Sequence, residues 1–248
     1  MAVFALTDLH IAVDELNLSC FANQVDVMAE SEELDVTTFC GGGYRQRITG
    51  LSTVMVNAQG FQDYVSPAPG SVFDGSVDMV SPGTTRTFTV APEGDTVGNV
   101  AYFGTCKTTS LSEVSGSVGE VAAFTMNTAG VSRLVRGQML HPVSAETSTG
   151  SGTTVAFTTP TATESLYATF HVHAVEGTGT IEFEIETDDT DSMTSAVTRI
   201  TSSEFDAVGA EIASLAGALA GETHVRVSWT ITDFTSVTFS VAVGVGST

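Results

Sequence analysis

The chain has 248 residues, with 8 Lys plus Arg against 29 Asp plus Glu and a formal net charge of −21. So few cations exclude a protein that wraps nucleic acid by neutralising phosphates, and one held on an anionic membrane by a basic patch. A hydrophobic content of 42% with only 15% charged residues excludes an acidic disordered chain. The chain can therefore bury a core, in one large or two modest domains.

The N-terminal segment does not resemble a signal peptide. Acids at Asp8, Asp14 and Glu15 interrupt its apolar run, and no basic region precedes it. No stretch approaches the ~18 apolar residues of a membrane helix. We expect a soluble protein, made in the cytoplasm, with no membrane partner. The three cysteines are widely spaced and lack a CxxC or Cys/His cluster, so we expect reduced, mostly structural thiols: Cys20, Cys40 and Cys106.

The N-terminal half is rich in strand patterns. One short helix is predicted at Ser71–Val80, between two Pro/Gly pairs, with Ser71 as its cap. The segment Asp35–Gly50 is polar and glycine-rich, and is predicted to be a long loop of the kind that is usually functional or disordered. The expected strands are Val3–Leu6, His10–Val13, Phe21–Ala29, Leu51–Phe61, Thr85–Val90, Val97–Leu111 and Glu120–Asn127.

A domain boundary is predicted near residues 137–152, where Ser144–Gly152 is small and polar as a linker or surface loop would be. We expect one domain at 1–138 and a second at 139–248. Residues 1–150 hold 16 acids and 6 bases, and residues 151–248 hold 13 acids and 2 bases. Both halves are acidic, so the charge belongs to the whole surface.

Strands of period two dominate the C-terminal half, which predicts an all-β sandwich, Ig-like or jelly-roll-like. Leu166–Val175 and Thr180–Thr187 are expected to form a hairpin through the glycines of 176–179. A second pair is expected at 225–231 and 237–243, with a turn at Asp233–Ser236. Weaker candidates are strands at Val155–Phe157 and Ala196–Ile200 and a second helix at Ala210–Ala220.

No catalytic motif is present. There is no GxSxG or HExxH, and the glycines at 41–43 precede Tyr44 and Arg45, not the Lys-Ser/Thr of a phosphate loop. We expect neither an enzyme nor a cofactor. Two groups are metal candidates, each with a plainer alternative as a solvated face: His171 with His173, joined by His224, and the turn carboxylates Asp188, Asp189 and Asp191.

Four of the eight cations fall in two small groups, Arg45 with Arg47 and Arg133 with Arg136. On so acidic a chain, this placement indicates ion pairs with an acidic surface. One hypothesis is a second copy of the chain, through its Glu30, Glu32, Glu33 and Asp35. The alternative, pairing within one chain, fits the sequence equally well.

The stretch Leu34–Leu51 resembles the N-terminal region of tail tube (major tail) proteins of long-tailed, siphovirus-like viruses of bacteria and archaea. It has an acid-rich strand, then Asp35-Val36-Thr37-Thr38-Phe39, a glycine run, Tyr44-Arg45, Arg47, and Thr49-Gly50-Leu51 opening the next strand. Gly98–Asn127 and Leu134–Gly137 also look like this family. The sequence departs from the family pattern at Thr49, where proline is common, and at Cys40.

The resemblance implies an all-β fold: a tail-tube β-sandwich or half-barrel with one short helix, followed by an outer β-sandwich. It implies a structural virion protein, assembled in the host cytoplasm into hexameric rings that stack into the viral tail with other tail proteins. DNA would pass through an acidic lumen without specific binding. Inter-subunit contact residues would be Asp35, Thr37, Phe39, Tyr44, Arg45, Arg47, Arg133 and Arg136.

The alternative function is another virion β-protein, a capsid decoration or a tail-tip adhesin that binds host glycans. Trp229 and Tyr167 would then stack on sugars, although core packing also accounts for them. The acidic surface with a single Lys is also typical of proteins from halophilic hosts, since strong salt screens the repulsion. A GC-rich genome is the other explanation for Arg over Lys.

Overall fold

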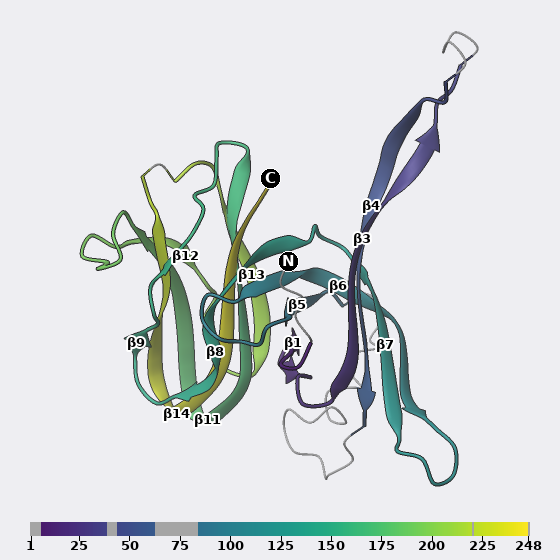
Figure 1. The fold of residues 1–248 in the computed structure, drawn as a ribbon. Coiled ribbons are helices and arrows are strands. Elements are labelled where there is room, and N and C mark those ends of the chain that lie inside the picture. Colours follow the sequence, from purple (N-terminus) through teal and green to yellow (C-terminus); the bar gives the residue numbers. More distant parts are fainter. Residues whose placement is uncertain (1–5, 39–43, 63–83, 220, 248) are drawn as a thin grey trace.

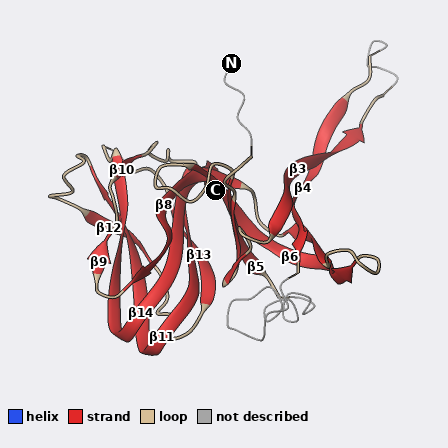
Figure 2. Cartoon of the chain, turned by 60° about the horizontal axis from the view of Figure 1, so that its bottom comes forward, coloured by secondary structure: helices blue, strands red, loops and turns tan. Residues whose placement is uncertain are grey.

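The computed structural model describes residues 6–38, 44–62, 84–219 and 221–247. The fold is all-β, as expected, and its strands join into one antiparallel sheet system (Figures 1 and 2). The main path runs β12-β11-β14-β8-β6-β5-β1-β2, and a branch continues from β6 through β7 and β4 to β3. The strands are β1 (His10–Val13), β2 (Leu16–Asn17), β3 (Ala22–Asp35), β4 (Arg47–Phe61), β5 (Arg86–Ala91), β6 (Val100–Ser115), β7 (Ala123–Gly130), β8 (Val135–Glu146), β9 (Gly150–Ser151), β10 (Val155–Ala156), β11 (Glu164–Asp188), β12 (Val197–Thr201), β13 (Gly209–Ala216) and β14 (His224–Ser247).

Period-two patterns produce many of these strands and bury one side of them. In β7, Phe124, Met126 and Thr128 are buried, whereas the residues between them are half exposed. The buried side chains form three clusters: one inside the C-terminal sandwich, one under the N-terminal sheet, and a small one between them around Phe103 and Met139. β8 pairs with β6 through Val135–Gln138 and with β14 through 137–146, so it connects the two halves across the predicted boundary.

The two predicted C-terminal hairpins are wrong. Residues 164–188 form the single strand β11 and residues 224–247 the single strand β14, and the two pair antiparallel along nearly their whole lengths. The register shifts near Gly177, and both strands curve together there (Figure 1). A Cβ at Gly179 would overlap the backbone of Thr232 and Phe234. The glycines thus let the backbones of β11 and β14 approach closely at a bend. They do not form the hairpin turn that was predicted from their permissive backbone.

The predicted helix at Ala210–Ala220 is also wrong, because residues 209–216 form β13. This strand pairs with Ser165–Val172 of β11, and Ile212 packs on the small cluster between the halves. A free strand edge and an apolar contact override a modest helix propensity. No helix occurs in the described part of the chain, and hence none long and apolar enough to cross a membrane. The helix expected at 71–80 lies outside the described residues.

Candidate inter-subunit surfaces

The β3–β4 hairpin forms a long arm that projects from the N-terminal sheet (Figure 1). Part of the expected loop Asp35–Gly50 is therefore strand, because β3 runs to Asp35 and β4 begins at Arg47. Every side chain of β3 beyond residue 27 is exposed, and so is β4 from 47 to 53 except the half-buried Gly50. A two-stranded ribbon with both faces in water is marginal by itself. The arm therefore has the character of a segment that a partner covers.

The register makes the outer half of the arm amphipathic. Leu34 is paired with Ile48, and a Cβ on Gly50 would touch the side chains of Leu34 and Glu32, so these residues share one face. Glu33, paired with Thr49, lies on the other face, where the Arg47 guanidinium donates to it at 2.5 Å. One face therefore carries Leu34 and Ile48 beside Glu32, and the other carries an internal ion pair.

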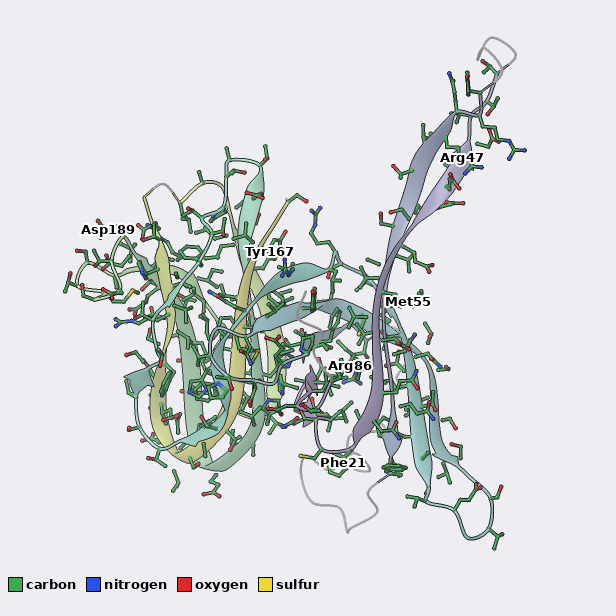
Figure 3. The ribbon with its side chains drawn as sticks, in the orientation of Figure 1. Phe21, Arg47, Met55, Arg86, Tyr167 and Asp189 are labelled. Atoms are coloured by element: carbon green, nitrogen blue, oxygen red, sulfur yellow. The ribbon has the colours of Figure 1, made fainter. Side chains whose placement is uncertain are left out.

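The predicted contact residues on the arm are brought together at its end. The Asp35 carboxylate accepts from the Thr37 backbone N–H at 2.9 Å, and its hydrogen bonds with Thr37 lower the pKa of Asp35. The Thr37 hydroxyl accepts from the Gln46 N–H at 2.9 Å across the ribbon. Tyr44 and Arg45, just before Gln46, are exposed, and Figure 3 shows Arg47 near the arm's end. Phe39 lies outside the described residues.

Arg47 forms its ion pair within the same chain, which is the alternative to pairing with a second copy. Both partners remain about half exposed, 47% and 60% by side chain, so the pair contributes little stability. Arg45 makes no ion pair within the described residues. The second arginine group lies away from the arm: the guanidinium of Arg133 donates to the Ser247 hydroxyl, and Arg136 lies on β8 beside a groove lined by Gln138, Phe157 and Glu164.

In the described part of the chain, the four-stranded sheet β3-β4-β7-β6 has two open edges. One is β3, which pairs there only with β4. The other is on β6, which pairs with β5 and β8 up to Cys106, whereas among the described residues its segment 107–115 pairs only with β7. Each neighbouring pair in this sheet is antiparallel, so β3 and β6 run in opposite directions. An unpaired edge offers a row of backbone donors and acceptors to another chain.

One face of this sheet covers the N-terminal core and the other is open. The open face is mostly uncharged, and it includes the cross-strand pair of Met28 and Met55; Figure 3 labels Met55 on β4. Among the described side chains of this face, the charged ones are Asp26, Glu30 and, toward the arm, Glu32 on β3, with Lys107 on β6. The remaining side chains are amides and hydroxyls, with one alanine: Gln24, Thr53, Asn57, Gln59, Thr125, Asn127 and Ala129.

The histidine metal candidates have a structural role in this fold. His171 Nδ1–H donates to the Asp14 carbonyl and its Nε2 accepts from the Thr89 hydroxyl, both at 2.8 Å. His173 Nδ1–H donates to the Glu15 carbonyl at 2.8 Å, and its Nε2 is 3.0 Å from the Ser240 hydroxyl. All four ring nitrogens are occupied, so neither imidazole offers a lone pair to a metal. The pair instead ties the sandwich to the β1–β2 turn.

Burial dominates the electrostatics of this junction. It lowers the pKa of His171 to about 3 and of His10 to about 4, with smaller contributions from neighbouring imidazoles, and it also lowers the pKa of His173. Burial raises the pKa of Asp14, opposed by Arg86, which donates to its carboxylate at 2.8 Å. The three histidines are therefore neutral at pH 7.

The second metal candidate is a self-contained turn. The Asp188 carboxylate accepts from the backbone N–H groups of Thr190, at 3.1 Å, and Ser195, at 2.7 Å. Hydrogen bonding with Asp188 raises the pKa of Asp189. Within the described residues no three acidic, histidine or cysteine side chains converge as a metal site would need. His224, the proposed third ligand, bonds Thr223 instead.

The aromatic residues considered for sugar stacking are used internally. Trp229 is only 6% exposed, packs edge-on against His141 and Phe239, and donates to the Ser148 carbonyl at 2.9 Å. Tyr167 packs on the small cluster between the halves and donates to the Ser247 carbonyl at 3.3 Å. The segment around residue 148 is thus a surface loop held to β14.

Sequence reasoning missed one apolar surface, the β6–β7 hairpin. Val114, Val118 and Val121 are all strongly exposed there. Valines in a Gly/Ser-rich turn give no periodic signal, and only the hairpin's protrusion reveals that no core covers them (Figure 1).

No protein-family model and no curated protein matches the chain. Solved structures do resemble it. A protein from the virion of a native gene transfer agent particle is 18% identical, with a TM-score of 0.43 over 53% of this chain and 97% of that chain. The SPP1 tail tube protein is 12% identical, with a TM-score of 0.41 over 54% and 78%. The Dit (gp 19.1) protein of SPP1, described as a hub of the adsorption apparatus, is 12% identical, with a TM-score of 0.35 over 96% and 99%. Identities and TM-scores this low leave the function to be argued from the chain's own residues.

Proposed function

We propose that this chain is a structural virion protein that forms hexameric rings of a viral tail tube. The observation that carries the proposal is the sheet β3-β4-β7-β6, whose outer edges are both unpaired in the described residues and run in opposite directions. β6 of one copy set beside β3 of the next continues the antiparallel order. Repeated around a ring, this contact closes the sheet into a barrel and removes every open edge.

In such a ring the open face of the sheet lines the lumen, because the other face is covered by the N-terminal core. Its neutral amides, hydroxyls and methionines, with Asp26, Glu30, Glu32 and Lys107 as the charged side chains among those described, give DNA no phosphate-binding group there beyond Lys107. Most of the acidic charge then lies elsewhere. The sandwich of residues 139–248 would form the outer layer, where both its bases are already in ion pairs, Arg199 with Glu222 and Arg226 with Glu186.

Single proline substitutions at positions 26 to 29 of β3 test the ring. Backbone N–H groups in a strand point alternately to its two neighbours. Prolines that remove an N–H directed to β4 should destabilise the subunit, whereas those that remove one directed to the open edge should leave it folded and monomeric. Size by light scattering and negative-stain images give the readout. Wild-type protein that stays monomeric at high concentration in high salt would rule the ring out.

A further inference from the structure

Exposed apolar side chains gather at the two ends of β4. We call Leu34, Val36, Tyr44, Ile48 and Leu51 the arm patch; it surrounds the start of β4. We call Phe61, Val114, Val118 and Val121 the hairpin patch; it surrounds the end of β4, where Phe61 pairs with Ala123 just after the β6–β7 turn. A strand of 15 residues spans about 50 Å at ~3.3 Å per residue, so the patches lie at opposite ends of the subunit.

Nothing in the described part of the chain covers either patch. Tyr44 and Leu51 are 82% and 81% exposed on the arm, and Val118 is fully exposed on the hairpin. By contrast, the sandwich exposes only Val197 and Val208 among the large hydrophobic residues of the described part. Apolar surface gathered in this way marks an interaction site.

Beside each patch lies one charge of opposite sign to the other. On the arm, Glu33 neutralises Arg47, whereas Arg45 has no acidic partner within the described residues. On the hairpin, the exposed Glu120 accepts from the Ser117 N–H at 2.9 Å and has no cationic partner in the described part of the chain. Arg45 and Glu120 are therefore a cation and a carboxylate that the described part of one subunit leaves without an opposite charge, and they can pair between two copies.

We propose that the arm patch of one copy docks on the hairpin patch of the next copy, head to tail, with Arg45 meeting Glu120. The contact is heterologous, so it repeats without closing and stacks one ring on the next. The inference rests on the proposed ring, and it assigns the acceptor surface for the arm to the β6–β7 hairpin. It names Glu120, and not the acidic stretch of β3, as the partner of Arg45; within that stretch Glu33 already binds Arg47 in the same chain.

A charge swap in the full-length chain tests the contact. Arg45→Glu and Glu120→Arg should each shorten tubes to single rings and raise the protein concentration needed for stacking by at least about tenfold. The double variant Arg45→Glu with Glu120→Arg should restore stacking, because the pair is re-formed with opposite polarity. If Glu120→Arg acted only by removing the carboxylate that accepts from the Ser117 N–H, Arg45→Glu on the arm would not restore stacking. Glu176→Arg, the same charge change at an exposed site on the sandwich, is the control and should stack normally.

A second pair of variants tests the apolar part. Val118→Ser with Val121→Ser should weaken stacking by a similar factor and leave the melting temperature unchanged, since both side chains are in water in the subunit. Normal stacking by either single charge variant, or a double variant no better than the singles, would overturn the contact. Wild-type rings that never stack would overturn the stacking contact but not the proposed ring. Monomers at every concentration would remove the ring and the contact together.

Discussion

The Nδ1–H of His171 on β11 donates to the backbone carbonyl of Asp14, 157 residues earlier, at 2.8 Å. A carbonyl only accepts, so this contact fixes the tautomer: Nδ1 carries the proton and Nε2 is left to accept from Thr89. The Thr89 hydroxyl also bonds that of Thr169 at 3.0 Å. This run of buried hydrogen bonds uses both ring nitrogens of His171, and it joins the C-terminal sandwich to the N-terminal turn.

This junction makes stability depend on pH. The folded pKa values of His171 and His10, about 3 and about 4, lie below the ordinary 6.5, so the unfolded chain binds more protons between these values. The contribution of these histidines to stability is complete above about pH 6.5 and falls as the pH drops. Between pH 6 and 5, unfolding should take up protons at His171, His10 and His173. Urea unfolding at several pH values should give a slope that His171→Gln reduces by about one proton, roughly 1.4 kcal/mol per pH unit. An unchanged slope would contradict this account.

The close approach at Gly179 gives a second prediction. Gly179→Ala forces a Cβ into the backbone of β14 and should lower the free energy of unfolding by at least about 2 kcal/mol. Gly209→Ala is the matched control within the sandwich, where the nearest atom to the new Cβ is 3.8 Å away on Phe205. It should change stability by less than about 0.5 kcal/mol. Chemical denaturation measures both, and equal effects would show that the bend does not depend on the glycine.

The arm ion pair should matter little to the isolated subunit. Arg47→Gln is expected to lower the free energy of unfolding by no more than about 0.5 kcal/mol, since both side chains are about half exposed. Reversing Arg45 and Arg47 to Glu together should weaken ring stacking without unfolding the monomer. Circular dichroism and electron microscopy of the same samples separate the two effects. Unchanged assembly by the double variant would remove the arm from the interface.

Salt should stabilise the protein. The net charge is −21, and within the described residues Arg47, Arg86, Arg199 and Arg226 are already in ion pairs with acids. The remaining carboxylates repel one another, and dissolved ions screen that repulsion. The melting temperature should rise steeply between 0.1 M and 3 M KCl. A flat response in KCl would leave the halophile hypothesis without support.

The sequence by itself determined what depends on neighbours along the chain. Period-two patterns indicated most strands, such as His10–Val13 and Thr85–Val90, and the charge excluded nucleic-acid wrapping. The resemblance of Leu34–Leu51 to tail tube proteins implied Asp35, Thr37, Tyr44, Arg45 and Arg47 as contact residues, and the structure places them toward one end of the arm. They are close in sequence, so a short stretch of the chain was enough to group them.

Only the tertiary structure decided what depends on distant partners. Gly177 and Gly179 suit a hairpin turn as well as a bend, and pairing with the long strand β14 selected the bend. The helix propensity of residues 210–216 yielded to the open edge of β11. His171 and His173 share a strand face as metal ligands would, but the carbonyls of Asp14 and Glu15 occupy them. Only the folded structure shows that no core covers Val118, because burial is a property of the folded chain and not of the local pattern.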